Sequence, residues 1–195
     1  MRTSFVPALL TIAVGAFAGA AAAAPVTYNI DPNHTYPTFE ADHMGGMSFW
    51  RGKINSSSGK IVLDKAAGTG SVEVTMDMKT IDFGHDALNA HAQTADLFDT
   101  AKYPTATYTG KLVKFQNGSP TEVDGTLTMH GVTKPVTLKI NSFQCREHPM
   151  QKKDFCGADA SATINRDDFG VDFGKQMGFK MAVTLRISVE AIVGS

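Results

Sequence analysis

The sequence is poor in cysteine, in charged residues and in long apolar runs. It has two cysteines and one tryptophan among 195 residues. Two cysteines are too few for a disulfide-rich scaffold or for a four-cysteine zinc site. Charged residues make up 19% of the chain and the formal net charge is -1, which gives no electrostatic signature of binding to nucleic acid or to an anionic membrane surface. The length and the hydrophobic fraction of 43% fit one globular domain.

Signatures of common catalytic and cofactor sites are also missing. The chain contains no phosphate-binding loop and no G-x-S-x-G, H-E-x-x-H or C-x-x-C motif. Its six histidines show no metal-ligand spacing along the chain, although a site assembled in space stays open. We therefore predict a protein that is not an enzyme, without catalytic residues, a metal ion or another cofactor.

The first segment, residues 1–23, is typical of a secretory signal peptide. Arg2 precedes an uncharged, mostly apolar run over residues 5–19, and the alanines that follow offer a cleavage site, which we place after Ala23. A retained membrane anchor is the alternative. Cleavage leaves residues 24–195 as one domain, for which we expect the periplasm and no stable membrane insertion.

Alternation of apolar and polar residues with a period of two dominates the rest of the chain. It is clearest in residues 181–192, where Val183, Leu185 and Ile187 alternate with polar side chains. Such runs predict strands at 35–43, 47–55, 60–64, 72–79, 105–115, 122–130, 136–141, 158–165 and 181–192. Because closing a sheet removes its exposed edges, the pattern favours an all-β fold in which an antiparallel sheet of about eight strands closes on itself. A β-sandwich is the alternative architecture.

Short segments between the strands predict turns and one helical insert. Asn117-Gly118, Ser58-Gly59 and His130-Gly131 have the composition of hairpin turns. Residues 86–98 lack glycine and proline and contain one β-branched residue, which favours one or two short helices.

Cys145 and Cys156 enclose a segment that contains Pro149 and a charged tip. In an oxidising compartment this spacing predicts a disulfide across a hairpin loop, at the tip and away from the core. Closing a loop of this size stabilises a protein by about 3 kcal/mol in the chain-entropy model. A metal or haem ligand set that includes His148 is the alternative.

Methionine and phenylalanine are abundant, with nine and 12 residues. Methionine adapts to irregular apolar guests, although ordinary core filling is the simpler explanation for any single residue. Alternation decides which residues share a strand face but not which face is inside. Our candidates for residues that line a ligand channel are Phe39, Phe49, Met76, Leu127, Met129, Phe169, Phe179 and Val183.

Seven segments share their order and spacing with a known family. They read YNIDPNHT at 28–35, FEADH at 39–43, DALNAH at 86–91, ADLFD at 95–99, KYPTA at 102–106, GTLTMHGVTKPV at 125–136 and NRDDFGV at 165–171. In these segments the chain resembles the YceI-like family of lipid- or polyisoprenoid-binding proteins. The resemblance implies an all-β fold, an extended eight-stranded antiparallel barrel of lipocalin-like shape with a short helical insert. It also implies an elongated apolar channel for a long isoprenoid lipid, either polyprenyl or quinone-like.

The leading hypothesis is therefore a periplasmic transport or carrier protein whose partner is an isoprenoid lipid. The rival hypothesis is an electron-transfer partner that depends on a metal, haem or quinone and uses His34, His43 or His91. We predict no nucleic-acid partner, and a homodimer is left open.

Overall fold

The computed structural model describes residues 24–194, so the predicted signal segment lies outside the described residues. Within that range, no helix is long and apolar enough to cross a membrane. The strands are β1 Val26–Ile30, β2 Tyr36–His43, β3 Ser48–Ile54, β4 Ser57–Asp64, β5 Thr69–Asp77, β6 Ile81–Asp82, β7 Thr105–Val113, β8 Glu122–Met129, β9 Val132–Glu147, β10 Asp154–Asn165 and β11 Ala182–Val193. The helix is α1 Asp86–Ala92, and single 3-10 turns are η1 Met78–Thr80, η2 Arg166–Phe169 and η3 Lys175–Met177.

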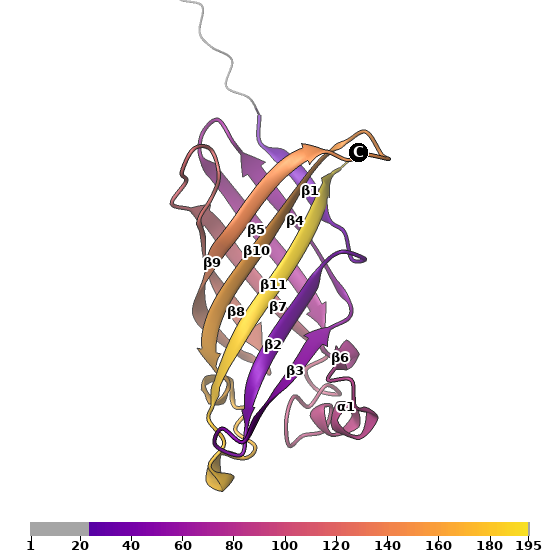
Figure 1. Cartoon of the computed structure of the whole chain (residues 1–195), viewed down its shortest axis with the longest axis vertical. Coiled ribbons are helices and arrows are strands. Elements are labelled where there is room, and N and C mark those ends of the chain that lie inside the picture. The colour runs from indigo at the N-terminus through magenta and orange to yellow at the C-terminus, as the bar shows by residue number, and fades with distance from the viewer. Residues whose placement is uncertain (1–23, 195) are drawn as a thin grey trace, which may run out of the picture.

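The strands form a closed antiparallel barrel, which Figure 1 shows from the side. The order is β1-β4-β5-β7-β8-β9-β10-β11, and β11 pairs with β1 to close the ring. β11 pairs with β1 along one part of its length and with β2 along another. Beside that second part, β2, β3 and β6 follow one another in the sheet, in the same order as β1, β4 and β5 beside the first part. The predicted eight-stranded barrel is confirmed, and the sandwich alternative is excluded.

Strand alternation turns the apolar side chains inward. On β8, Val123 and Leu127 are buried, whereas Asp124 and Thr126 are exposed. The two-residue turn after β8 has positive φ at both His130 and Gly131, as its sequence predicts. Asn117 and Gly118 also have positive φ, in the predicted turn between β7 and β8.

A β-bulge explains why β9 is much longer than its predicted range. The register of β9 against β10 shifts after Ile140, so that Asn141 is skipped in the pairing. A bulge reverses which side chains face inward, and beyond it Phe143 and Cys145 join the core. The period-two pattern breaks at this point, which hides the second half of the strand from sequence analysis.

Three other local predictions differ from the structure. The helical insert is shorter than residues 86–98, because α1 ends at Ala92 and turns follow it. The alternation pattern predicted no strand at residues 26–30, where the structure has β1. The Ser58-Gly59 turn is wrong, since both residues pair within β4. A Cβ atom on Gly59 would clash with the Glu73 carbonyl oxygen, so only glycine allows β4 and β5 to approach this closely here.

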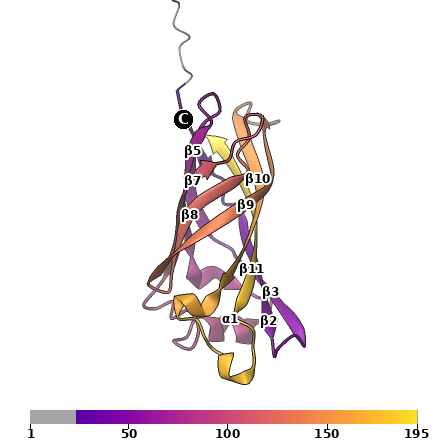
Figure 2. The ribbon, with the colours of Figure 1, turned by 90° about the vertical axis from the view of Figure 1, so that its left-hand side faces the viewer.

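The barrel has two different ends, as Figures 1 and 2 show. We call the end that carries the β4–β5 turn (65–68) and the β9–β10 hairpin (148–153) the capped end. The opposite end, which we call the mouth end, carries the β2–β3 hairpin (44–47), α1 and the β10–β11 loop (166–181).

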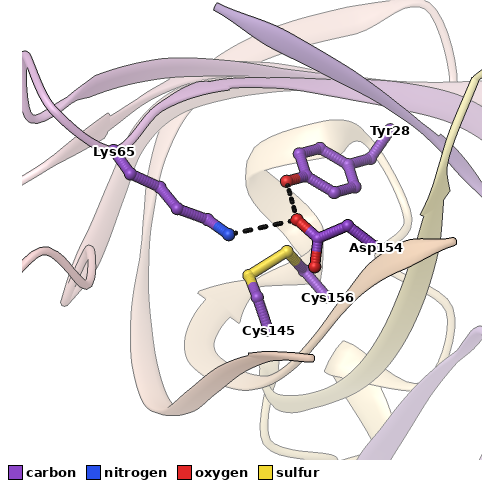
Figure 3. Close-up of a disulfide and its surroundings, with 5 residues drawn as sticks. All are labelled: Tyr28, Lys65, Cys145, Asp154 and Cys156. Carbon is purple, nitrogen blue, oxygen red and sulfur yellow. Dashed lines mark hydrogen bonds and ion pairs between the residues drawn. A yellow bond between two sulfur atoms is a disulfide. The ribbon is translucent and has the colours of Figure 1, made fainter. Parts of the chain in front are cut away.

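The predicted disulfide between Cys145 and Cys156 is confirmed, but its predicted place is wrong. The two residues face each other across β9 and β10, inside the hairpin and not at its tip. Cys156 is buried in the main core. Figure 3 shows the bridge beside Asp154, whose carboxylate accepts hydrogen bonds from the hydroxyl of Tyr28 at 2.7 Å and from Lys65 Nζ at 3.2 Å. The disulfide lies closer to the core than predicted because the bulge at Asn141 turns Cys145 inward.

Candidate functional site

A cavity of about 550 Å³ occupies the barrel interior. The lining side chains come from every strand position and are almost all apolar, with the charged residues Asp42 and Arg166 near the mouth end. Pockets of this size and polarity hold apolar ligands. A second hollow of about 450 Å³ lies on the outer face of the barrel and is lined mainly by polar side chains, so it offers much less apolar surface.

Small side chains on β10 keep the interior hollow. The residues of β10 that point inward from its middle are Ala158 and Ala160, where neighbouring strands present larger residues such as Ile140 and Ile187. Inward-facing apolar side chains of other strands stay only partly buried because they border the void: Val72, Val74, Leu185, Ile187 and Val189. Apolar side chains therefore line the barrel interior but leave a cavity at its centre, whereas an ordinary protein core is closely packed.

The capped end is filled by side chains. Tyr28, Leu63 and Ala191 are 2%, 2% and 1% exposed, and with the disulfide they pack beyond the end of the cavity. Burial raises the pKa of Tyr28, and the adjacent Asp154 carboxylate raises it further, so this phenol stays protonated as a hydrogen-bond donor. The interior is therefore closed by side chains at this end, whereas the cavity extends toward the mouth end.

Aromatic and imidazole rings surround the cavity at the mouth end. The ring of His43 meets those of Trp50 at 5.6 Å and Phe179 at 5.2 Å between centroids, in edge-to-face arrangements. His91 meets Phe173 at 4.8 Å. Phe173 is 37% exposed, so the cavity wall reaches solvent here. This rim combines apolar ring faces with nitrogen atoms that accept or donate hydrogen bonds.

Arg166 holds the β10–β11 loop in place at this rim. Its guanidinium donates to the carbonyl oxygens of Val171 at 2.8 Å and Phe173 at 2.7 Å. Burial lowers the pKa of Arg166, although three nearby aspartates favour its charged form. Because both of its terminal nitrogens donate to backbone carbonyl oxygens of the β10–β11 loop, Arg166 fixes the conformation of this loop at the mouth end.

Six of the eight predicted lining residues lie on the cavity wall. Phe39, Met76, Leu127, Met129, Phe179 and Val183 come from β2, β5, β8, β11 and the β10–β11 loop. The inward face is thus the apolar face on each of these strands. Whether a ligand contacts these residues stays a prediction.

Phe49 and Phe169 do not lie on the cavity wall. Phe49 is 58% exposed, because alternation along β3 turns Trp50 inward and Phe49 outward. Phe169 is 2% exposed and packs in the core, since η2 turns it away from the strand direction after Asn165. Neither position follows from residue type alone.

Sequence reasoning missed several wall residues, including Trp50, Tyr108 and the alanines of β10. The hydroxyl of Tyr108 donates to the carbonyl oxygen of Val136 at 2.8 Å, and burial raises the pKa of this phenol. Its ring lies against Gly125, where an added Cβ atom would come within 2.5 Å of the hydroxyl oxygen. Gly125 lies diagonal to Tyr108 across the strand pair, because Tyr108 is opposite Leu127, and a glycine at that diagonal position leaves room for the tyrosine ring.

The histidines of the rival hypothesis do not come together. His34 is paired with Asp31 at 2.7 Å near β1, and the Asp31 carboxylate raises the pKa of His34. His43 and His91 both line the cavity, on β2 and α1. Among residues 24–194, no three His, Cys, Asp or Glu side chains are grouped as a metal site requires.

Comparison with known proteins finds similarity along almost the whole chain. Residues 28–191 match the family model described as a YceI-like domain. Protein YceI of Escherichia coli is 33% identical over 178 residues, which cover 90% of each chain. BcnA of Burkholderia cenocepacia is 20% identical with a TM-score of 0.66, covering 83% of this chain and 99% of its own. A polyisoprenoid binding domain from Saccharophagus degradans is 16% identical with a TM-score of 0.62, covering 87% and 99%. The two structures support the fold.

Proposed function

The chain belongs to the YceI-like family, and on this premise we propose that it is a periplasmic carrier that holds a long isoprenoid chain and catalyses no reaction. The observation that carries the proposal is the apolar cavity along a barrel that is filled at one end. The similar domain from Saccharophagus degradans is described as polyisoprenoid binding, which supports the same ligand class here.

The polarity of the cavity orients the ligand. The isoprenoid tail lies among Val72, Ile187 and their neighbours, where burial of apolar surface stabilises the complex by about 25 cal/mol per Å². The head group lies at the mouth end, where His43 and His91 supply polar atoms. Part of the binding free energy is lost to ordering a flexible chain, so a long tail is needed for tight binding.

Two independent features support export to the periplasm. The sequence of residues 1–23 is typical of a secretory signal. The disulfide between Cys145 and Cys156 is stable in an oxidising compartment and is rare in a reducing one.

The experiment is organic extraction of protein purified from a periplasmic fraction, followed by mass spectrometry. We expect an isoprenoid lipid at a fixed ratio to the protein. A matched variant, Leu185→Asp, puts a carboxylate on the cavity wall and should lose this lipid, because an ionised group without a partner is costly to bury against an apolar tail. Thr184→Asp, on the outer face of the same strand, should retain it. Equal lipid contents in the two folded variants would refute the proposed binding place.

The rival electron-transfer function has one observation in its favour, since His43 and His91 both line the cavity. An absorbance spectrum and a metal analysis of the same sample test it. A haem absorbance band would favour electron transfer over the carrier function. So would a metal ion that is bound at a fixed ratio to the wild-type protein and is lost in a His91→Ala variant.

A further inference from the structure

A layer of side chains ends the cavity at the capped end of the barrel. On β1, β4, β9, β10 and β11, an inward residue lines the cavity, and the inward residue two positions nearer the capped end does not. The pairs, with the lining residue first, are Ile30 and Tyr28, Ile61 and Leu63, Phe143 and Cys145, Ala158 and Cys156, and Val189 and Ala191. We call the second residues of these pairs the floor.

The floor is closely packed. Cys156 lies opposite Cys145 on one neighbouring strand and opposite Ala191 on the other, so these three residues form a continuous row. Tyr28 and Leu63 belong to the same buried cluster as Cys156 and Ala191. Because these four side chains are buried, the floor leaves no passage for an apolar chain.

Covalent and polar contacts hold the floor in place, as Figure 3 shows. The disulfide joins Cys145 on β9 to Cys156 on β10. The Asp154 carboxylate, at the start of β10, accepts hydrogen bonds from Tyr28 on β1 and from Lys65 in the β4–β5 turn. The Lys65 ammonium also lies 5.9 Å from the centroid of the Tyr28 ring. Four segments of the chain are thus tied together here, so the floor resists displacement by a ligand.

A closed and anchored floor limits how much of an apolar tail can be buried. One isoprene unit carries several methyl and methylene groups, so each unit that enters the cavity raises the affinity about tenfold or more. A unit for which the cavity has no room stays in water at the mouth end and adds nothing. Forcing it inward would overpack the floor, which destabilises the protein.

We propose that the floor sets the longest isoprenoid tail that the cavity buries, so that this protein selects its ligand by tail length. The inference rests on the proposed carrier function, because a head group held at the mouth end leaves the tail to extend toward the floor. It adds a limit that the apolar character of the cavity wall does not impose.

The test compares farnesol, geranylgeraniol and solanesol, which carry the same hydroxyl head group on isoprenoid tails of increasing length. Their affinities are measured by displacement of the fluorescent apolar dye N-phenylnaphthylamine from lipid-free protein. Wild type should bind geranylgeraniol about tenfold more tightly than farnesol. Solanesol should bind no more tightly than geranylgeraniol, because a cavity of about 550 Å³ buries a drug-sized ligand and solanesol is larger.

Two variants move the limit in opposite directions. Leu63→Ala removes a floor side chain and should raise the affinity for solanesol about tenfold relative to geranylgeraniol. Leu185→Ala is the matched control, because the same change on the cavity wall widens the cavity without deepening it. Ala158→Leu adds a side chain directly above the floor, where the cavity offers space for it, so this variant should fold. It should reduce the advantage of geranylgeraniol over farnesol.

Three results would overturn the proposed length limit. The first is a wild-type affinity that rises from geranylgeraniol to solanesol as steeply as from farnesol to geranylgeraniol. The second is the same ratio of solanesol to geranylgeraniol affinity in Leu63→Ala and Leu185→Ala. The third is an unchanged length profile in folded Ala158→Leu, which decides the question if Leu63→Ala does not fold. Wild-type protein that binds none of the three alcohols would instead overturn the carrier function itself.

Discussion

Filling the cavity with a larger side chain tests whether the barrel interior is a ligand site. Ala158 faces inward from β10 and is partly exposed to the cavity, with Phe143 and Val189 as its cross-strand neighbours. In Ala158→Phe, the ring would extend into a space of about 550 Å³ that we assign to the isoprenoid tail.

The size of the effect distinguishes a lined cavity from a packed core. Adding a ring to a packed core costs about 1–3 kcal/mol. For a domain of this length, each kcal/mol lowers the melting temperature by about 2–4 °C. Because the ring has free space here, we expect the melting temperature of lipid-free Ala158→Phe to stay within about 2 °C of the wild type. The amount of lipid that co-purifies should fall to a small fraction.

The assay combines mass spectrometry of extracted lipid with thermal melts of protein stripped of lipid, since bound ligand itself raises the melting temperature. Thr163→Phe adds the same ring to the outer face of β10 and should keep the lipid. A folded Ala158→Phe protein with wild-type lipid content would refute the assignment of the cavity to the ligand. A large drop in its melting temperature would show that the interior is packed.

Three further predictions concern the wall, the disulfide and acid stability. Met129→Asp, on the cavity wall, should lose the lipid, whereas Thr128→Asp, which faces outward, should keep it in the same extraction assay. Replacing Cys145 and Cys156 by serine should lower the free energy of unfolding by about 2–3 kcal/mol in urea melts, and a thiol titration of the denatured wild type should find no free thiol. Arg186 and Arg51 lower the pKa of the Glu40 carboxyl below its usual value of 4.5. The free energy of unfolding of the wild type should therefore be slightly larger than that of Glu40→Gln above pH 4.5, and this difference should vanish as the pH falls further. A difference in unfolding free energy that grows in acid would refute this.

The alternation in β8 and β11 was sufficient to predict an all-β fold, but it left the β-sandwich open, and the family resemblance favoured the barrel. A period of two over many residues is compatible only with strands, and antiparallel strands of this number avoid exposed edges by closing. The turns at Asn117-Gly118 and His130-Gly131 were predictable for a local reason, since both residues of each turn need positive φ.

The same local reasoning failed where glycine or cysteine serves a contact between distant segments. Gly59 lies inside β4 because of the Glu73 backbone on the neighbouring strand, and no local pattern reveals this neighbour. Cys145 faces the core because a bulge shifts the register of β9. Bulges depend on the pairing of two strands and leave no signature in either one alone.

For the candidate site, the sequence by itself determined which residues share a face and that the chain has enough apolar residues to line an interior. Only the tertiary structure decided that this face turns inward, that the alanines of β10 lie opposite larger side chains, and that Phe49 is outside while Trp50 is inside. It also joined the β2–β3 hairpin to the β10–β11 loop, because the Asp42 carboxylate accepts hydrogen bonds from the backbone of both. The physical reason is that periodicity is a property of one strand, whereas a cavity arises from how several strands are placed against one another.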